Sequence, residues 1–206
     1  MANELKHVER INGVVALKSS HPTVKKIKRD LDGFSYHGNK IWHSCYVLMD
    51  FLKQFPPEPQ SKVIELGCGW GLLSAFVAKE FNAEVTGVDA DANVKPFYEL
   101  HAEVNGVDLS FKKKRFEQVK GKLLQGTDLV VGSDICFWDE MVDPLKKFVK
   151  QAVKSDVKRI CIADPGRDPF WELSEYCREK WGAEVYHHTV KKPTKMTKYI
   201  MELELD

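Results

Sequence analysis

The chain has 206 residues and a mass of 23.6 kDa, a size typical of one globular domain. It is 43% hydrophobic and 30% charged, which excludes an intrinsically disordered protein. Lys and Arg number 31 against 30 Asp and Glu, so the formal net charge is only +1. No global attraction to nucleic acid or to anionic lipid follows, and we expect neither as a partner.

The first ten residues, MANELKHVER, are charged and resemble no secretory signal, and apolar runs are too short to cross a bilayer. We therefore expect a cytoplasmic protein. Its cysteines are widely spaced, without a CxxC pair, and its histidines lack ligand spacing, so we expect neither a disulfide framework nor a metal site. The five cysteines are Cys45, Cys68, Cys136, Cys161 and Cys177.

The N-terminal quarter of the chain has a weak pattern. Apolar residues at 14–17 indicate a short strand, and Pro22 suits the first position of a helix. Apolar residues spaced by three and four predict an amphipathic helix over 39–55. Asn39 is its expected N-cap, and the prolines from Pro56 end it.

From residue 62 onward, strands and helices alternate. Strands are predicted at 62–66, 83–89, 109–116, 128–134 and 158–165, with helices at 72–81, 92–106, 141–154 and 170–181. Such alternation predicts a parallel sheet covered by helices on both faces. The last two strands, 183–192 and 198–205, are joined too closely for a parallel crossover and must form an antiparallel hairpin. We therefore expect an α/β, Rossmann-like, doubly wound fold with a mostly parallel seven-stranded sheet.

The main chemical signal is a glycine-rich turn between the first of these strands and its helix. It carries Glu65, Gly67, Gly69 and Gly71. Glycines let backbone N–H groups approach a ligand, and the helix N-terminus adds a partial positive charge. Asp89 ends the next strand, 22 residues after Gly67 (89 − 67), where a carboxylate can accept ribose hydroxyl protons. This combination predicts a nucleoside-cofactor site.

The glycine spacing discriminates between cofactors. A dinucleotide fingerprint requires its third glycine three residues after the second, where this chain has Leu72. Glu65, two residues before the first glycine, disfavours a pyrophosphate and suits a ligand bearing an ammonium and a sulfonium. S-adenosylmethionine is therefore favoured, and a nicotinamide oxidoreductase is disfavoured.

The segments VIELGCGWG, VTGVDAD and DLVVGSD resemble those of the class I, seven-β-strand, S-adenosylmethionine-dependent methyltransferases. The resemblance covers roughly residues 36–206, including the closing hairpin. It implies an enzyme that transfers a methyl group and releases S-adenosylhomocysteine.

A finer resemblance is to the small methyltransferases that modify protein lysines, including the enzyme for the β subunit of electron-transfer flavoprotein. It is carried by the Trp-containing segment 41–44, by the turn 132–134 and by the Asp-Pro-Gly-Arg segment 164–167. Two departures are Phe137, where many such enzymes have Tyr, and residues 115–119, which lack the usual Asp-Trp.

This resemblance implies roles for individual residues. The cofactor would be held by Trp42, Glu65, Gly67, Cys68, Gly69, Gly71, Asp89, Ala90, Phe116, Glu117 and Ser133. Within that set, Glu65 and the glycines would hold the methionine part and Asp89 the ribose. Phe116 and Glu117 would flank the adenine. The substrate would contact Phe137, Trp138, Asp164 and Arg167, with Asp134 as the catalytic residue.

Simpler structural roles are open for three of these residues. Trp42 and Phe116 also suit core positions, and Asp134 also suits a cap for the helix that follows it. The basic run 112–115 is expected to be a solvated strand edge.

We expect one domain, in which residues 1–55 form a helical extension on the substrate side and residues 56–206 bind S-adenosylmethionine. The favoured acceptor is a nitrogen nucleophile, above all a protein lysine. The alternatives are a small-molecule methyltransferase and a non-catalytic cofactor-binding or interaction module, because fold alone does not fix function.

Overall fold

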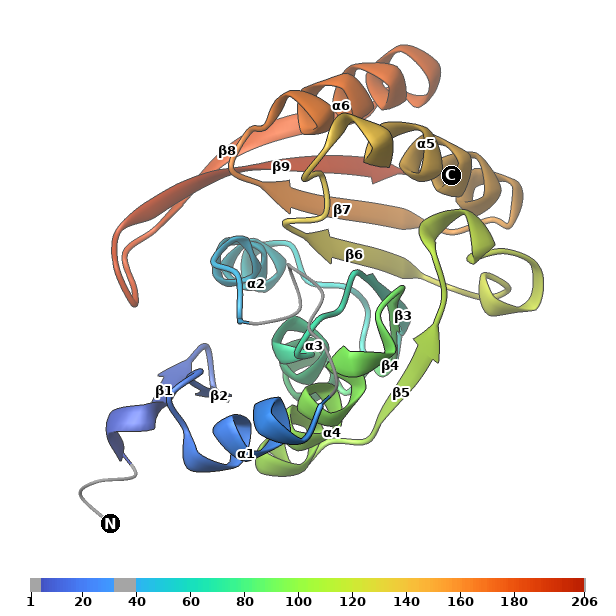
Figure 1. The fold of residues 1–206 in the computed structure, drawn as a ribbon. Helices are drawn as coiled ribbons and strands as arrows, with labels where there is room; N and C mark the ends of the chain where they lie inside the picture. The colour runs from blue at the N-terminus through green and yellow to red at the C-terminus, as the bar shows by residue number, and fades with distance from the viewer. Residues whose placement is uncertain (1–4, 32–39, 206) are drawn as a thin grey trace.

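A computed structural model describes residues 5–31 and 40–205. Its main sheet has seven strands in the order β5-β4-β3-β6-β7-β9-β8 (Figure 1). The strands are β3 (Lys62–Leu66), β4 (Glu84–Asp89), β5 (Leu109–Lys113), β6 (Leu129–Ser133), β7 (Arg159–Asp164), β8 (Glu184–Val190) and β9 (Met196–Glu204). Strands β3 to β7 pair in parallel, whereas β9 runs antiparallel to both β7 and β8. The predicted sheet and its closing hairpin are confirmed.

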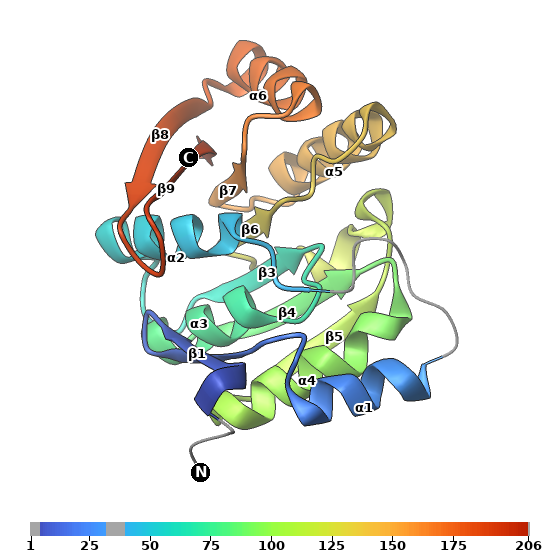
Figure 2. The same cartoon turned by 60° about the vertical axis from the view of Figure 1, so that its left-hand side comes forward.

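Helices cover both faces of this sheet (Figure 2). One face carries α2 (Ser44–Gln54), α3 (Leu72–Phe81) and α4 (Lys95–Asn105). The other face carries α5 (Val142–Lys154) and α6 (Asp168–Trp181). Two buried apolar clusters, one on each face, hold these layers together. Burial of a large aliphatic or aromatic side chain contributes about 1.5–3 kcal/mol, so the clusters hold the central strands at whose carboxyl ends the glycine turn lies.

The N-terminal segment adds a small layer of its own. Strands β1 (Val8–Ile11) and β2 (Val14–Leu17) form an antiparallel hairpin, followed by α1 (Pro22–Asp30). The strand at 14–17 and the helix with Pro22 in its first turn are confirmed, whereas β1 was not predicted. The expected helical extension therefore also contains a β-hairpin.

Side chains of α4 anchor this hairpin. The Asn105 amide oxygen accepts from the Val15 N–H at 2.7 Å, and its amide nitrogen donates to the Val15 carbonyl at 3.0 Å. His101 Nε2 accepts from the Leu17 N–H, and its Nδ1 donates to the Phe97 carbonyl. Burial lowers the pKa of His101 to about 4, consistent with the neutral ring that this pattern requires. The layer is therefore fixed beside the glycine turn through α4.

Two predicted boundaries were wrong. The helix expected at 39–55 begins at Ser44, because the Asp134 carboxylate of the β6 end accepts its first free N–H at 3.0 Å. Asn39, the expected cap, lies outside the described residues. The strand expected at 109–116 ends at Lys113, and Phe116 begins a 3-10 turn, Phe116–Gln118. Trp42 thus precedes its helix, and Phe116 is not a strand residue.

Within residues 5–31 and 40–205, no helix combines the length and apolarity needed to cross a membrane. Over the same described residues, His, Cys, Asp and Glu side chains do not gather in threes as a metal site requires. All five cysteines are buried and unpaired with one another.

Candidate cofactor and acceptor site

The glycine turn lies at the carboxyl end of β3, at the central strands of the sheet. Gly67, Gly69 and Gly71 have φ angles of +60°, +49° and +75°, which other residues rarely adopt. A Cβ at Gly71 would lie 2.5 Å from the Tyr98 ring, and one at Gly67 would lie 2.6 Å from Ile135. A Cβ at Gly69 would meet no atom within 4 Å. The outer two glycines are thus required by packing, whereas Gly69 faces open space where a ligand can approach.

Glu65 lies beneath this turn and is almost completely buried, with 3% of its surface exposed. Its Oε2 accepts hydrogen bonds from the backbone N–H and the hydroxyl of Ser74, in the first turn of α3. The Tyr98 hydroxyl in turn donates to Ser74 Oγ at 3.1 Å. Burial raises the pKa of Glu65 to about 8, although the Ser74 hydrogen bonds act in the opposite direction.

Asp89 ends β4 and faces the glycine turn. One carboxylate oxygen accepts from the Gly69 N–H at 3.0 Å and the other from the Asp91 N–H at 2.9 Å. Burial raises the pKa of Asp89 above its usual range. Oδ2 of Asp91 is buried and has no hydrogen-bond partner among the described residues. A ligand hydroxyl beside Asp89 would donate a hydrogen bond to this oxygen. The end of β4 therefore offers carboxylate acceptors that suit the hydroxyl groups of a ribose.

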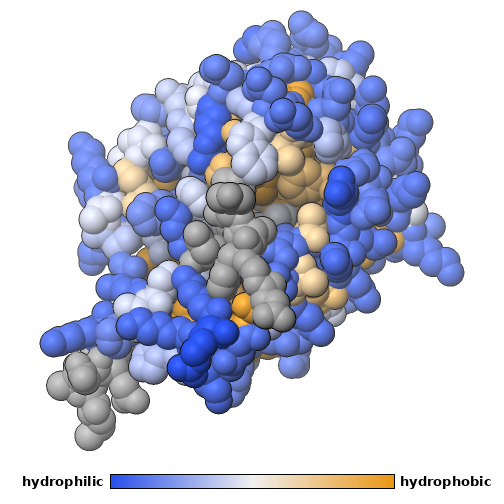
Figure 3. All heavy atoms as spheres, in the orientation of Figure 1, coloured by the Kyte–Doolittle hydropathy of each residue, from blue (hydrophilic) through white to orange (hydrophobic). Residues whose placement is uncertain are grey.

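A cavity of about 40 Å³ lies against the glycine turn. Six of the predicted cofactor residues line it: Trp42, Glu65, Gly67, Cys68, Gly71 and Ser133. This volume is too small for a nucleoside, so most of such a ligand would have to lie outside the cavity. In the orientation of Figure 1, the rim of the molecule is largely hydrophilic and apolar side chains gather toward the middle of the face (Figure 3).

The remaining predicted cofactor residues do not line the cavity. Phe116 is half-buried, and its ring lies 4.0 Å from the position of a Cβ at Gly67. Glu117 is also half-buried, and Ala90 is exposed next to Asp89. Their positions around the turn are compatible with a ligand that extends from Gly69 toward β5, and their roles stay predictions.

The ends of β6 and β7 form a charged cluster beside the cavity. Asp134, with φ +55°, is buried, and its Oδ2 accepts from the Ser44 N–H while its Oδ1 pairs with Arg167 at 3.2 Å. Arg167 also pairs with the fully buried Asp164 at 2.6 Å. Its guanidinium lies 4.6 Å from the centre of the Phe137 ring. The four predicted residues Asp134, Phe137, Asp164 and Arg167 are thus brought together.

Aromatic rings surround this cluster. Trp42 meets Phe137 edge to face, with ring centres 5.2 Å apart. Trp138 and Trp171 follow the ends of the two strands and remain 49% and 41% exposed. The site therefore joins the glycine turn, two carboxylates bridged by an arginine, and aromatic rings of which two are exposed.

Trp70, between the second and third glycines, was not predicted to contribute. Its ring stacks on Phe97 at 4.8 Å and lies 5.9 Å from His101 on α4. It borders the cofactor cavity and also an adjoining cavity of about 260 Å³. The sequence signal for its role was its position between Gly69 and Gly71. A large ring at that position has to pack against a neighbouring element, here α4.

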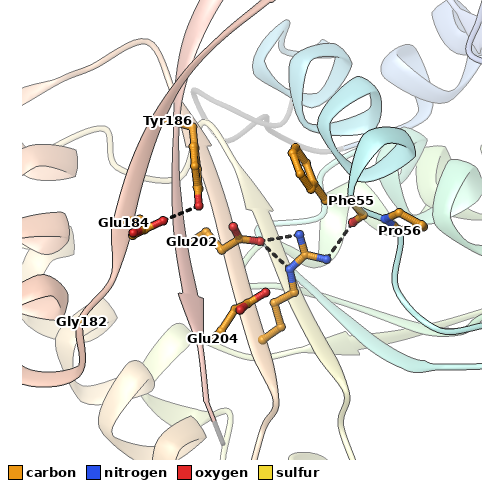
Figure 4. A pocket seen from close by; sticks show the side chains of 8 residues that line it. Phe55, Pro56, Gly182, Glu184, Tyr186, Glu202 and Glu204 are labelled. Carbon is orange, nitrogen blue, oxygen red and sulfur yellow. Dashed lines mark hydrogen bonds and ion pairs between the residues drawn. The ribbon is translucent and has the colours of Figure 1, made fainter.

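A second, larger cavity of about 620 Å³ lies at the other end of the sheet (Figure 4). It opens where β7 begins at Arg159, beside Phe55, Glu184 and Glu202. Arg159 donates to the Glu202 carboxylate and, at 2.8 Å, to the Phe55 carbonyl. Because neither the glycine turn nor Asp89 lines this cavity, it is not the cofactor site.

The family model for lysine methyltransferases matches residues 23–168, more than half of the chain. The chain belongs to the lysine methyltransferase family. This match begins in α1 and ends at the start of α6, so it includes the glycine turn, Asp89, Asp134 and Arg167. A search of curated protein sequences finds no match.

Solved structures show the same fold at low sequence identity. TrmN from Thermus thermophilus aligns with a TM-score of 0.63 and 14% identity, over 80% of this chain and 50% of that one. A tRNA (uracil-54, C5)-methyltransferase from Pyrococcus abyssi, in complex with S-adenosyl-L-homocysteine, aligns with a TM-score of 0.62 and 16% identity over 95% and 43%. Magnesium protoporphyrin IX methyltransferase from Synechocystis PCC 6803, with bound SAM, aligns with a TM-score of 0.62 and 17% identity over 90% and 92%. This chain spans half the length of TrmN and less than half the length of the tRNA (uracil-54, C5)-methyltransferase.

Family and fold together make the protein an S-adenosylmethionine-dependent methyltransferase. The residues present fit that cofactor: Gly69 is open on its ligand side, and the unpaired Oδ2 of Asp91 lies next to Asp89. The structural relatives include enzymes named for tRNA and for a porphyrin, so the fold alone does not select the methyl acceptor.

Proposed function

We propose that this methyltransferase transfers the methyl group to the ε-amino nitrogen of a lysine in a protein substrate. The observation that carries the proposal is the aromatic pair Trp42–Phe137 beside the buried carboxylate of Asp134. Phe137 already holds a cation against its face, the guanidinium of Arg167. Ammonium groups are attracted by aromatic faces and by carboxylates in the same way, so this surface suits a lysine side chain.

The bound S-adenosylmethionine supplies a methyl group already activated by its sulfonium. The residues of the chain then have to align the amine and exclude water, which provides most of the acceleration of such a transfer. Asp134 is held rigidly by Ser44 and Arg167, and it accepts a hydrogen bond from the incoming amine in the proposed arrangement. This contact orients the nitrogen and draws a proton away from the methyl-transfer path.

The N-terminal segment supplies the second wall of the acceptor side. Ile41 and Trp42 reach the cofactor cavity from the chain just before α2. The exposed Trp138 and Trp171 would contact residues that flank the acceptor lysine, which favours a protein substrate over an enclosed metabolite.

Isothermal titration with S-adenosylmethionine, with NADH as the control, tests the first half of the proposal. We expect binding of S-adenosylmethionine alone, and its loss in Asp89→Ala without loss of the folded state. The second half is tested with labelled methyl donor, a lysine-containing peptide library and a set of small amines. Label on peptide lysines is expected, whereas label confined to small amines would favour the small-molecule alternative.

A cofactor that binds without any methyl transfer to either set would favour a binding module. Loss of peptide methylation in Asp134→Ala at unchanged cofactor affinity would support the role of Asp134. Full turnover in Asp134→Ala would show that Asp134 has no catalytic role.

A further inference from the structure

Lys40 is an exposed residue just before Trp42, and its side chain borders the cofactor cavity. Its Nζ lies 4.1 Å from the centre of the Trp42 ring. Of the residues that line this cavity in the described part of the chain, Lys40 is the one lysine. The ammonium group of Lys40 therefore lies over the face of the Trp42 ring at the cofactor cavity.

The position differs from that of the other nearby lysines. Lys18 lines the adjoining cavity of about 260 Å³ but not the cofactor cavity. Lys28 lies 5.1 Å from the Trp70 ring, and it borders neither of these two cavities. Only Lys40, of these three, combines an aromatic face with a border on the glycine turn.

The aromatic pair has a cation on each of its rings. Arg167 lies over Phe137 and is tied to Asp134 and Asp164, so it is held in place. Lys40 lies over Trp42, and among the described residues no carboxylate pairs with its ammonium. An aromatic contact alone is weak at an exposed site, which leaves the amine able to move toward the cofactor.

We propose that Lys40 is itself methylated by this enzyme, within its own chain. The inference rests on the proposed function, because it takes the same pair of rings as the surface that receives an acceptor amine. The ammonium of Lys40 first loses a proton to water. The lone pair of Nζ then forms the C–N bond to the methyl carbon while the S–CH3 bond breaks, and the electron pair of that bond stays on sulfur as S-adenosylhomocysteine forms.

The test incubates the purified full chain with S-adenosylmethionine that carries a deuterated methyl group, without any other acceptor. Peptide mass spectrometry then locates the label, with Lys18 as the internal control. We expect label on Lys40 and not on Lys18, at a first-order rate that does not change when the protein is diluted tenfold. Lys40→Arg retains the positive charge beside Trp42 and is expected to lose this label.

A second readout does not depend on turnover. A small acylating reagent is applied with and without S-adenosylhomocysteine, and its rates at Lys40 and Lys18 are compared. Because Lys40 borders the cofactor cavity, the ligand should slow its acylation several-fold while Lys18 is unchanged. Equal rates at Lys40 with and without the ligand would contradict its placement.

The outcomes separate this inference from the proposed function. If the same preparation binds S-adenosylmethionine and labels peptide lysines but never Lys40, the inference is wrong and the proposed function stands. If the cofactor does not bind, both are wrong. A labelling rate that rises in proportion to protein concentration would overturn methylation within one chain.

Discussion

Replacing Glu65 with glutamine isolates the cost of placing a carboxyl group beneath the glycine turn. The glutamine oxygen can still accept the two hydrogen bonds from Ser74, but the side chain no longer ionises. In the folded protein without cofactor, burial raises the pKa of Glu65 from 4.5 to about 8. The substitution therefore removes a pH-dependent penalty while keeping the shape of the site.

The sign of the effect follows from proton counting. Between pH 4.5 and pH 8, the unfolded chain has released the Glu65 proton while the folded chain still holds it. The unfolded state binds fewer protons, so this residue makes stability fall as the pH rises through that window. At about 1.4 kcal/mol for each pKa unit, its contribution worsens by about 2.5 kcal/mol between about pH 5.5 and about pH 7.5.

Urea unfolding of the wild type and of Glu65→Gln at these two pH values, without cofactor, measures the effect. We expect the free-energy gap between the two proteins to shift by about 2.5 kcal/mol in favour of the variant at the higher pH, or about 5–10 °C in Tm. Glu103→Gln, at an exposed position on α4, is the matched control for loss of a carboxylate. If the difference in unfolding free energy between the wild type and Glu65→Gln changes by less than about 0.5 kcal/mol between the two pH values, as expected for a surface substitution, the raised pKa of Glu65 is refuted.

Three further predictions concern single contacts. Gly71→Ala should lose about 2–4 kcal/mol of unfolding free energy in urea, because it combines a left-handed backbone with a clash on Tyr98, and Tyr98→Leu in the same chain should recover part of it. Asp134→Asn should lower kcat for peptide methylation about 10²- to 10⁴-fold at unchanged cofactor Kd, whereas a matching loss of affinity would assign Asp134 to cofactor binding. Arg167→Ala should lower the free energy of unfolding by about 3 kcal/mol, because it leaves the buried carboxylates of Asp134 and Asp164 unpaired, and an unchanged urea midpoint would show that other groups compensate.

The sheet could be predicted because its signals are local in the sequence. Short apolar runs ending in glycine or aspartate define β3, β4 and β6, and the brief link between the last two strands requires an antiparallel pair. The glycine turn was predictable for the same reason, since three glycines within five residues indicate backbone that other residues rarely adopt.

Helix starts were less predictable where the cap comes from elsewhere in the chain. The first turn of α2 receives its acceptor from Asp134, 90 residues away, so no local residue indicates where the helix begins. The cap considered for Asp134 was therefore assigned to the wrong helix, since its carboxylate caps α2 and not the helix that follows it, and its catalytic role stays a prediction. A cap of this kind holds α2 and the preceding Trp42 against the end of β6.

Arg167 shows most clearly what a linear sequence cannot specify. The resemblance of its Asp-Pro-Gly-Arg segment predicts a role on the substrate side, but its partners lie on two strand ends and one loop. Asp164 binds it within a tight turn, whose backbone N–H groups at Gly166 and Arg167 donate to the same carboxylate. The guanidinium is thereby directed at Asp134 and Phe137, so in the proposed function a lysine that approaches Asp134 would meet one fixed positive charge. Once the aromatic rings and Asp134 have attracted the ammonium, this positive charge would favour loss of its proton, which gives the neutral amine that can accept a methyl group.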